Sequence, residues 1–192
     1  IIYNCYNSSF SQLNDFARKD QIITVCLSDK EKTLFVKGVD FYIEVARAMP
    51  NYQFVVVGIG GAALKWLNEQ IPENVELIEP VSHEMLNQLY CLSKVICQFS
   101  RQEAFGVALL EGIASGCFPV GYNHAGTKEI LSGTSGLLID ALDIDLAVNA
   151  IENAFDMQTE DIQQIQTEVL ARFKCENRIQ QLNEAIEALF TK

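Results

Sequence analysis

Short apolar runs of strand length alternate with segments of helical periodicity along most of this chain. The runs are continuously apolar, which is typical of strands that are covered on both faces of a sheet. Such alternation indicates a parallel sheet whose strands are joined by right-handed crossovers. The expected strands are 22–27, 54–58, 75–78, 95–99, 119–122 and 136–139. The expected helices are 38–49, 61–70, 82–91, 104–115, 127–132, 143–155, 160–173 and 176–190. The sequence therefore predicts an α/β, Rossmann-like fold with a six-stranded parallel sheet and helices on both faces.

The 192 residues are enough for one α/β domain with its own core and too few for two. The hydrophobic content of 49% favours a packed core over disorder. The net charge of −11, without a basic stripe, argues against a nucleic-acid partner. The chain shows no signal-peptide pattern and opens at Ile1, so we expect a fragment of a longer protein.

The six cysteines form no Cys-x-x-Cys pair. Cys26 and Cys97 fall within expected strands, where a free thiol serves as a small hydrophobic side chain. This usage suits a reducing cytosol and argues against a zinc site. We therefore expect a cytoplasmic protein.

Two glutamates, Glu103 and Glu111, stand eight residues apart. Glu111 lies within the apolar or small segment 107–114, which is typical of a buried helix. An ionised carboxylate there costs several kcal/mol unless a polar group meets it. Glu103 falls where the expected helix begins, beside unpaired N–H groups and the positive end of the helix dipole. We interpret the pair as two acceptors for one ligand rich in hydroxyls and phosphates; the alternative is two ordinary surface glutamates.

The glutamates and the Phe105-Gly106 between them resemble the signature of retaining GT-B glycosyltransferases of the glycosyl transferases group 1, or family 4, type. In that family the first glutamate approaches the donor sugar and the second binds the ribose of the nucleotide. The resemblance implies a catalytic role for Glu103. It implies donor binding for Phe105, Gly106, Val107 and Glu111.

The N-terminal stretch 4–10 is similar to the Asn-Gly-Val-Asp…Phe stretch with which this family enters its C-terminal domain, with Cys5 in place of the usual glycine. The resemblance implies that residues 1–20 are an interdomain linker and that residues 21–192 form the C-terminal, donor-binding domain. The acceptor-binding N-terminal domain is then missing. We expect this fragment to be inactive alone.

Ligands of open α/β sheets bind outside the carboxyl ends of the strands. Lys37-Gly38, after the first expected strand, resembles the family's Lys-Gly pair that contacts the donor diphosphate; the alternative is a solvated lysine at a helix start. The family's arginine is absent, because its Gly-Arg-Leu reads here as Cys26-Leu27-Ser28. Lys30 or Lys32 could replace it as a point charge, without the bidentate fork of arginine. The departure leaves open a binding module that has lost catalysis.

The stretch 57–63 matches the pattern G-x-G-x-x-A, and Glu79 follows Gly58 by 21 residues. This imitates a dinucleotide-binding fingerprint and suggests an NAD-dependent oxidoreductase domain as an alternative. However, the fingerprint normally follows the first strand of its sheet, and here a complete βα unit precedes it. The family also has Val-Gly-x-Gly at this point, so the resemblance assigns Gly58 to the donor site, where it permits a tight turn.

Two further loops belong to the resemblance. The turn 79–82 precedes a helix that Ser82 can cap, and in the family it meets the nucleobase through backbone groups, which assigns Val81 to the donor site. His83 is expected at the surface.

The loop 122–129 resembles the family's Gly-Gly-x-x-Glu, with Ala125 in the first glycine's place. It adds Gly126, Thr127 and Glu129 to the donor site, where a helix N-terminus offers N–H groups to an anion. The alternative for Glu129 is a helix-dipole carboxylate in the first turn. His124 is expected to be exposed.

Asp143-Ile144-Asp145 is a D-x-D triplet, which metal-dependent glycosyltransferases of the other large fold use to hold a cation. Here it opens an expected helix, so we expect an N-cap. No other cluster has metal-ligand spacing, and we expect neither a metal nor another cofactor.

The resemblance implies the donor-binding domain of a retaining hexosyltransferase that uses a nucleotide-diphospho-sugar. The acceptor, a saccharide or lipid-linked molecule, would be bound by the missing domain. Polysaccharide or glycolipid assembly is the family's commonest setting, with peripheral membrane association of the full-length protein. The nucleobase, the sugar, the acceptor and the oligomeric state are not predicted.

Overall fold

A computed structural model describes residues 4–7, 9–11 and 17–190 and contains one six-stranded parallel sheet of order β3-β2-β1-β4-β5-β6. The strands are β1 (Lys19–Ser28), β2 (Gln53–Ile59), β3 (Val75–Ile78), β4 (Ser93–Gln98), β5 (Phe118–Tyr122) and β6 (Leu137–Ile139). The helices are α1 (Glu31–Val36), α2 (Val39–Ala48), α3 (Gly61–Asn68), α4 (His83–Leu92), α5 (Val107–Ala114), α6 (Ala125–Leu131), α7 (Ile144–Asp156), α8 (Thr159–Leu170) and α9 (Cys175–Phe190). The predicted fold class is confirmed.

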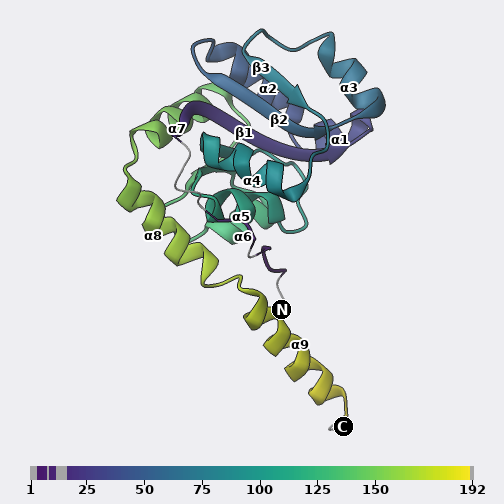
Figure 1. Cartoon of the computed structure of the whole chain (residues 1–192), viewed down its shortest axis with the longest axis vertical. Helices are drawn as coiled ribbons and strands as arrows, with labels where there is room; N and C mark the ends of the chain where they lie inside the picture. The colour runs from purple at the N-terminus through teal and green to yellow at the C-terminus, as the bar shows by residue number, and fades with distance from the viewer. Residues whose placement is uncertain (1–3, 8, 12–16, 191–192) are drawn as a thin grey trace.

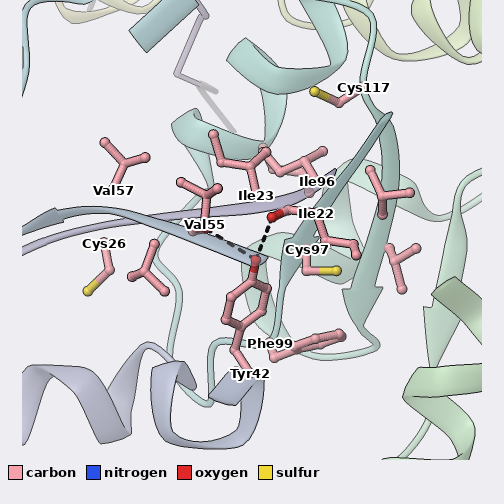
Figure 2. Packing of buried hydrophobic residues seen from close by; sticks show 14 of the residues in the cluster. Ile22, Ile23, Cys26, Tyr42, Val55, Val57, Ile96, Cys97, Phe99 and Cys117 are labelled. Atoms are coloured by element: carbon pink, nitrogen blue, oxygen red, sulfur yellow. Dashed lines mark hydrogen bonds between the residues drawn. The ribbon is translucent and has the colours of Figure 1, made fainter. Parts of the chain in front are cut away.

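The sheet is covered on both faces, as the continuous apolar runs predicted. Every residue from Phe54 to Ile59 in β2 is buried. Tyr42 of α2 donates its hydroxyl to the carbonyl oxygens of Ile22 (2.8 Å) and Val55 (3.2 Å), which ties that helix to β1 and β2 (Figure 2). α2 also packs against α7, whereas α4 packs against α5 and α8 contacts α5 (Figure 1).

The strand order reverses direction between β1 and β4. The chain runs from β1 to its neighbour β2 and then to β3, and it returns through α4 to β4 on the other side of β1. Crossovers that leave two adjacent strands in opposite directions open a crevice at the carboxyl ends of those strands. The fold therefore locates a ligand site between the ends of β1 and β4.

Two local expectations were wrong. No helix was expected between the first strand, 22–27, and the first helix, 38–49, but the structure has the short helix α1 there. Only Leu34 of α1 is buried, and its N-cap Lys30 makes no side-chain cap. Six residues with one buried side chain carry too little periodicity to predict a helix. The helix expected from residue 104 begins instead at Val107, after Gly106 in a left-handed conformation (φ +102°).

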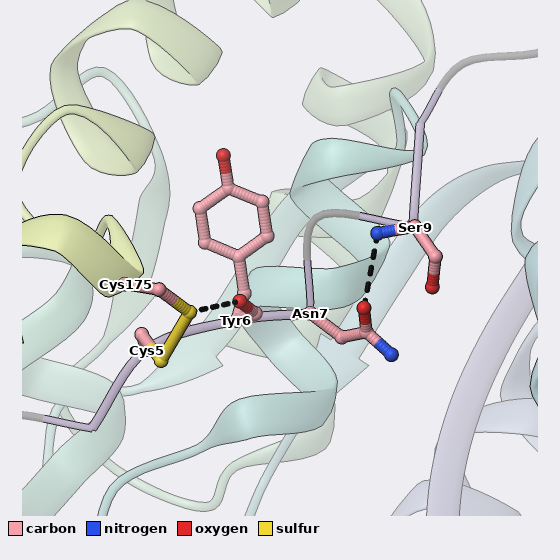
Figure 3. The surroundings of a disulfide bond; sticks show 5 residues. All are labelled: Cys5, Tyr6, Asn7, Ser9 and Cys175. Carbon is pink, nitrogen blue, oxygen red and sulfur yellow. Dashed lines mark hydrogen bonds between the residues drawn. A yellow bond between two sulfur atoms is a disulfide. The ribbon is translucent and has the colours of Figure 1, made fainter.

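The N-terminal segment packs on the domain. Phe10 is buried, with its ring centroid 5.8 Å from that of Tyr90 in α4. A disulfide joins Cys5 to Cys175 at the start of α9, which runs away from the sheet (Figures 1 and 3). Sequence reasoning missed this pair, whose members are 170 residues apart, because it interpreted the cysteine usage as that of a reducing cytosol, in which no disulfide was expected. Of the predicted linker 1–20, residues 1–3, 8 and 12–16 lie outside the described residues, and β1 already begins at Lys19.

The remaining four cysteines are unpaired and buried, as expected of Cys26 and Cys97 as small hydrophobic side chains. Within the part of the chain that the structure describes, no helix has the length and apolarity to cross a membrane.

Candidate functional site

A cavity of about 370 Å³ lies at the carboxyl ends of β1 and β4, where the strand order reverses. Its lining comes from the end of β1, from Gln98 at the end of β4, from Lys37, from the loop and first turn of α5, and from Asn4 of the N-terminal segment. The lining residues include Cys26, Leu27, Glu103, Phe105, Gly106, Val107 and Ala108. This is the position at which open α/β sheets bind their ligands, and the volume is within the usual range for a small-molecule pocket.

Lys37 and Glu103 form an ion pair in this cavity, with 2.9 Å between Nζ and Oε2. The lysine side chain is 34% exposed and the glutamate side chain 11% exposed. Gly38 fixes the position of Lys37: its φ is +70°, and a Cβ there would lie 2.1 Å from the carbonyl oxygen of Phe99. A cation beside a helix N-terminus is unfavourable unless an anion lies near it. The anion that meets Lys37 is the carboxylate of Glu103.

Glu103 accepts three hydrogen bonds, all through Oε2. Besides Lys37, the donors are Gln98 Nε2 at 2.8 Å and Ser100 Oγ at 3.3 Å. Within the described residues nothing donates to the other oxygen, Oε1. The expectation that Glu103 stands at the start of the helix was wrong, because the residue lies in the loop before Gly106, the N-cap of α5. The carboxylate is therefore held by side chains rather than by helix N–H groups.

Glu111 lies one turn beyond Val107 and Ala108, on the same side of α5, because residues three and four apart share a helix face. It does not line the cavity itself. The residue is half-buried, its carboxylate has no hydrogen-bond donor among the described residues, and burial raises its pKa to about 7. Burial, and after it the charge of Glu111, raises the pKa of Tyr90. The alternative of two ordinary surface glutamates is therefore wrong.

The position of the family's arginine is occupied by Leu27, which is 78% exposed although it lines the cavity. Lys30 and Lys32 are exposed and do not belong to the lining. Their proposed substitution for arginine has no support in this conformation. Of the described residues that line the cavity, Lys37 is the one that carries a positive charge.

Glu103 also borders a second hollow of about 480 Å³, together with Gly126, Lys128 and Glu129. Helix α6 begins at Ala125, whose φ of +46° is the left-handed conformation that the family's glycine would adopt readily. Glu129 is the fifth residue of α6, so the alternative that it is a first-turn dipole carboxylate was wrong. Gly126 donates its N–H to the backbone oxygen of Glu103 at 3.1 Å.

The close approach at Gly126 is to protein backbone. A Cβ there would lie 2.5 Å from the carbonyl oxygen of Phe105, so this glycine packs α6 against the loop that carries Glu103. Thr127 is fully buried, so its side chain is out of reach of a ligand in either hollow. Gly58 turns with φ +98° against the Cys26 carbonyl, and neither it nor Val81 lines the two hollows.

The structure thus places Lys37 and residues 103–107 around one cavity. Gly126 and Glu129 line the second hollow, which Glu103 also borders. Gln98 was missed, although a glutamine that interrupts the apolar run 95–99 was a visible signal.

Two predicted helix caps are confirmed. Ser82 Oγ accepts from the Met85 N–H at 3.2 Å, and Asp143 Oδ1 accepts from the Leu146 N–H at 3.0 Å. The D-x-D triplet therefore caps α7. Within the described residues, no three His, Cys, Asp or Glu side chains lie together as metal ligands would. His83 and His124 are exposed, as expected.

The sequence pattern of the glycosyl transferases group 1 matches residues 17–169. The chain belongs to this family.

Two curated relatives are similar to this chain in sequence. It is 29% identical over 144 residues to a subunit of the phosphatidylinositol N-acetylglucosaminyltransferase of Arabidopsis thaliana, an alignment that covers 71% of this chain and 32% of the relative. It is 25% identical over 169 residues to the GtfA component of the UDP-N-acetylglucosamine–peptide N-acetylglucosaminyltransferase of Streptococcus parasanguinis, covering 80% and 33%. The chain thus spans about a third of the length of these relatives.

Among solved structures, the sucrose-phosphate synthase of Thermosynechococcus elongatus superposes with a TM-score of 0.82 at 20% identity, over 99% of this chain and 52% of that one. This likeness confirms the Rossmann-like fold of a GT-B glycosyltransferase. The family membership does not support the dinucleotide-fingerprint interpretation, and the residues 58–63 do not line the cavity between β1 and β4.

Proposed function

We propose that this chain binds the nucleotide-diphospho-sugar donor of a retaining hexosyltransferase in the cavity between β1 and β4. The observation that carries the proposal is the Lys37–Glu103 ion pair, which places a cation and a carboxylate side by side where open α/β sheets bind ligands. In the proposed complex Lys37 contacts the diphosphate, Glu103 faces the sugar and Glu111 accepts hydrogen bonds from the ribose.

The proposed chemistry is electrostatic. Departure of the sugar leaves negative charge on the diphosphate and an oxocarbenium-like sugar. A fixed cation stabilises the negative charge on the diphosphate, and an adjacent carboxylate stabilises the oxocarbenium-like sugar. Retention of the anomeric configuration is inferred from the resemblance of the glutamate motif. The remainder of the longer protein would bind the acceptor, so this chain is expected to bind donor without transferring sugar.

The names of both curated relatives contain N-acetylglucosaminyltransferase, and one includes UDP-N-acetylglucosamine. We therefore propose UDP-N-acetylglucosamine as the first donor to be tested. No residue of the site distinguishes a uracil from another base, because the family's base contacts are made by backbone groups of the turn 79–82.

The direct test is a calorimetric titration of the 192-residue chain with UDP-, GDP- and ADP-sugars and with NAD. One nucleotide sugar should bind, its nucleoside diphosphate should compete with it, and NAD should not bind. Binding of NAD with no response to any nucleotide sugar would reject the proposal in favour of a dinucleotide domain.

A second candidate is a binding module that has lost catalysis, and Leu27 in place of the family's arginine favours it. Transfer assays on the full-length protein separate the two, because a degenerate module binds the donor without turning it over.

The substitution Leu27→Arg should tighten diphosphate binding roughly 10-fold, since a guanidinium forms charge-assisted hydrogen bonds to phosphate.

A further inference from the structure

Gln98 contacts the carboxylate of Glu103 at the end of β4. Its Nε2 donates to Glu103 Oε2 at 2.8 Å, whereas its own Oε1 is buried and has no donor among the described residues. An ionised carboxylate only accepts hydrogen bonds, so the NH₂ group of the amide must be the end that faces it. The glutamine thus leaves a buried acceptor unpaired in order to hold Glu103.

The surrounding backbone leaves room for this amide. Gly106 lies against it, and a Cβ at this glycine would be 3.0 Å from Gln98 Oε1 and 3.3 Å from Nε2. A side chain at position 106 would therefore displace the amide from Glu103.

The three donors to Glu103 differ in what a ligand would do to them. A diphosphate carries more negative charge than a carboxylate and competes for Lys37. When Lys37 turns to the phosphates, Glu103 keeps only Gln98 at 2.8 Å and Ser100 at 3.3 Å. The amide is neutral, so the diphosphate has no comparable attraction for it.

We propose that Gln98 is a positioning residue, which keeps Glu103 aimed at the donor sugar after Lys37 has moved its charge to the diphosphate. This inference rests on the proposed function of the site. It identifies Glu103 Oε1, which accepts no hydrogen bond from the described residues, as the oxygen offered to the sugar, because Oε2 remains bound to Gln98.

The test uses Gln98→Met, which removes the amide and keeps the length of the side chain, with UDP and UDP-N-acetylglucosamine as probes. The affinity for UDP should stay as in the wild type, whereas the affinity for UDP-N-acetylglucosamine should fall roughly 3- to 10-fold, the worth of about one hydrogen bond. The matched control is Gln102→Met, an exposed glutamine outside the cavity lining, which should change neither affinity.

A second variant, Gln98→Glu, gives a readout that a merely structural role would not move. The introduced carboxyl group faces Glu103 and Lys37. When protonated it donates to Glu103 as the amide does, and when ionised it repels Glu103. Sugar-dependent affinity should therefore recover as the pH is lowered in this variant, with no such recovery in Gln98→Met.

Three results would overturn the inference. Equal losses of UDP and UDP-N-acetylglucosamine affinity in Gln98→Met would show a structural role, and unchanged affinities for both would show no role. A Gln98→Glu variant without the pH-dependent recovery would contradict it even if Gln98→Met failed to fold. A wild-type chain that binds neither UDP nor UDP-N-acetylglucosamine would reject the UDP-sugar site itself, and this inference with it.

Discussion

At the residue scale, the half-buried carboxylate of Glu111 is unfavourable for the fold by itself, and we propose that it serves to bind the ribose of a ligand. Its pKa is about 7 in the folded chain, raised by burial from its ordinary value of 4.5. Well below pH 4.5 the group is protonated in both the folded and the unfolded states, so it does not alter stability. As the pH rises to 7 the unfolded state ionises first, so stability falls, and the full cost remains above pH 7.

Glu111→Gln removes this cost. Without ligand, the free energy of unfolding should rise by roughly 1–2 kcal/mol at pH 8, after allowance for the water that still reaches the carboxylate, and by less at pH 5.5. Denaturant unfolding of the variant and the wild type at pH 8 and at pH 5.5 measures these changes in the free energy of unfolding. Both pH values lie above the isoelectric point of the chain, which is about 4.6. A variant that is less stable than the wild type at pH 8 would show instead that the carboxylate has a structural partner.

The same substitution should weaken UDP binding roughly 10- to 100-fold, because charge-assisted hydrogen bonds to the ribose are worth about 1.5–3 kcal/mol. Gain of stability with loss of affinity is the expected pattern for a functional group that the fold does not need. Equal UDP affinity in variant and wild type would remove the ribose role.

Lys37→Ala should reduce the affinity for a nucleoside diphosphate roughly 10-fold or more and leave the affinity for the bare nucleoside unchanged, because an uncharged ligand has no use for the cation. Lys32→Ala is the matched control, since Lys32 is exposed and outside the lining. Calorimetric titration of both variants with the nucleoside diphosphate and with the bare nucleoside measures these affinities. If diphosphate affinity survived Lys37→Ala intact, backbone N–H groups would have to hold the phosphates, or the phosphates would bind elsewhere.

The sequence predicted much at this scale. The spacing of Glu103 and Glu111 and the Lys37-Gly38 pair identified the charged groups of the cavity wall and its neighbourhood. The ion pair between Lys37 and Glu103 and the hydrogen bond from Gln98 were not predicted, because they depend on how β1 and β4 come together in the sheet. Thr127 was assigned from a loop pattern that does not reveal which way a side chain points.

At the scale of elements, Gly38 joins α1 to α2 and sets the direction of Lys37. Gly38→Ala should lower the free energy of unfolding by more than about 3 kcal/mol, because left-handed strain adds to the overlap of its Cβ with the Phe99 carbonyl. Gly133 offers a matched control: its φ of +74° is similar, but a Cβ there would meet nothing within 4 Å. Gly133→Ala should therefore cost only about 1–2 kcal/mol. Denaturant unfolding measures both variants. Equal losses of the free energy of unfolding would show that the close contact between position 38 and the Phe99 carbonyl is unimportant.

Where the sequence pattern was clear, the predicted bounds of the elements agree with those in the structure. All six strands lie near their predicted positions, because each is an apolar run covered on both faces. Helix α1 was missed since it buries one side chain, and the start of α5 was misplaced because its N-cap is Gly106, so that Glu103 lies in the preceding loop.

At the scale of the whole molecule, the Cys5–Cys175 disulfide closes nearly the entire chain into a loop, with a separation of 170 residues. Cys175→Ser should lower the free energy of unfolding by about 2–5 kcal/mol under non-reducing conditions, because the cross-link restricts the unfolded chain. Cys5→Ser and the double variant should show the same loss, and a thiol reductant should bring the wild type to their level. Variants as stable as the non-reduced wild type would show that the bond does not form in solution.

The architecture was predictable because strand–helix alternation leaves few ways to bury the apolar runs. The position of the cavity was predictable only as a rule about strand ends, since the strand order that creates the crevice between β1 and β4 depends on long-range pairing. The disulfide was beyond sequence reasoning, because pairing among six cysteines is not determined by their spacing.

The most direct measurement is a crystal structure of the chain with the nucleotide sugar that binds in the titration. We predict that Lys37 contacts the diphosphate instead of Glu103, that the sugar lies against Glu103 while Gln98 still donates to it, and that the ribose contacts Glu111. A ligand bound elsewhere, with the Lys37–Glu103 ion pair unchanged, would contradict the proposed donor site.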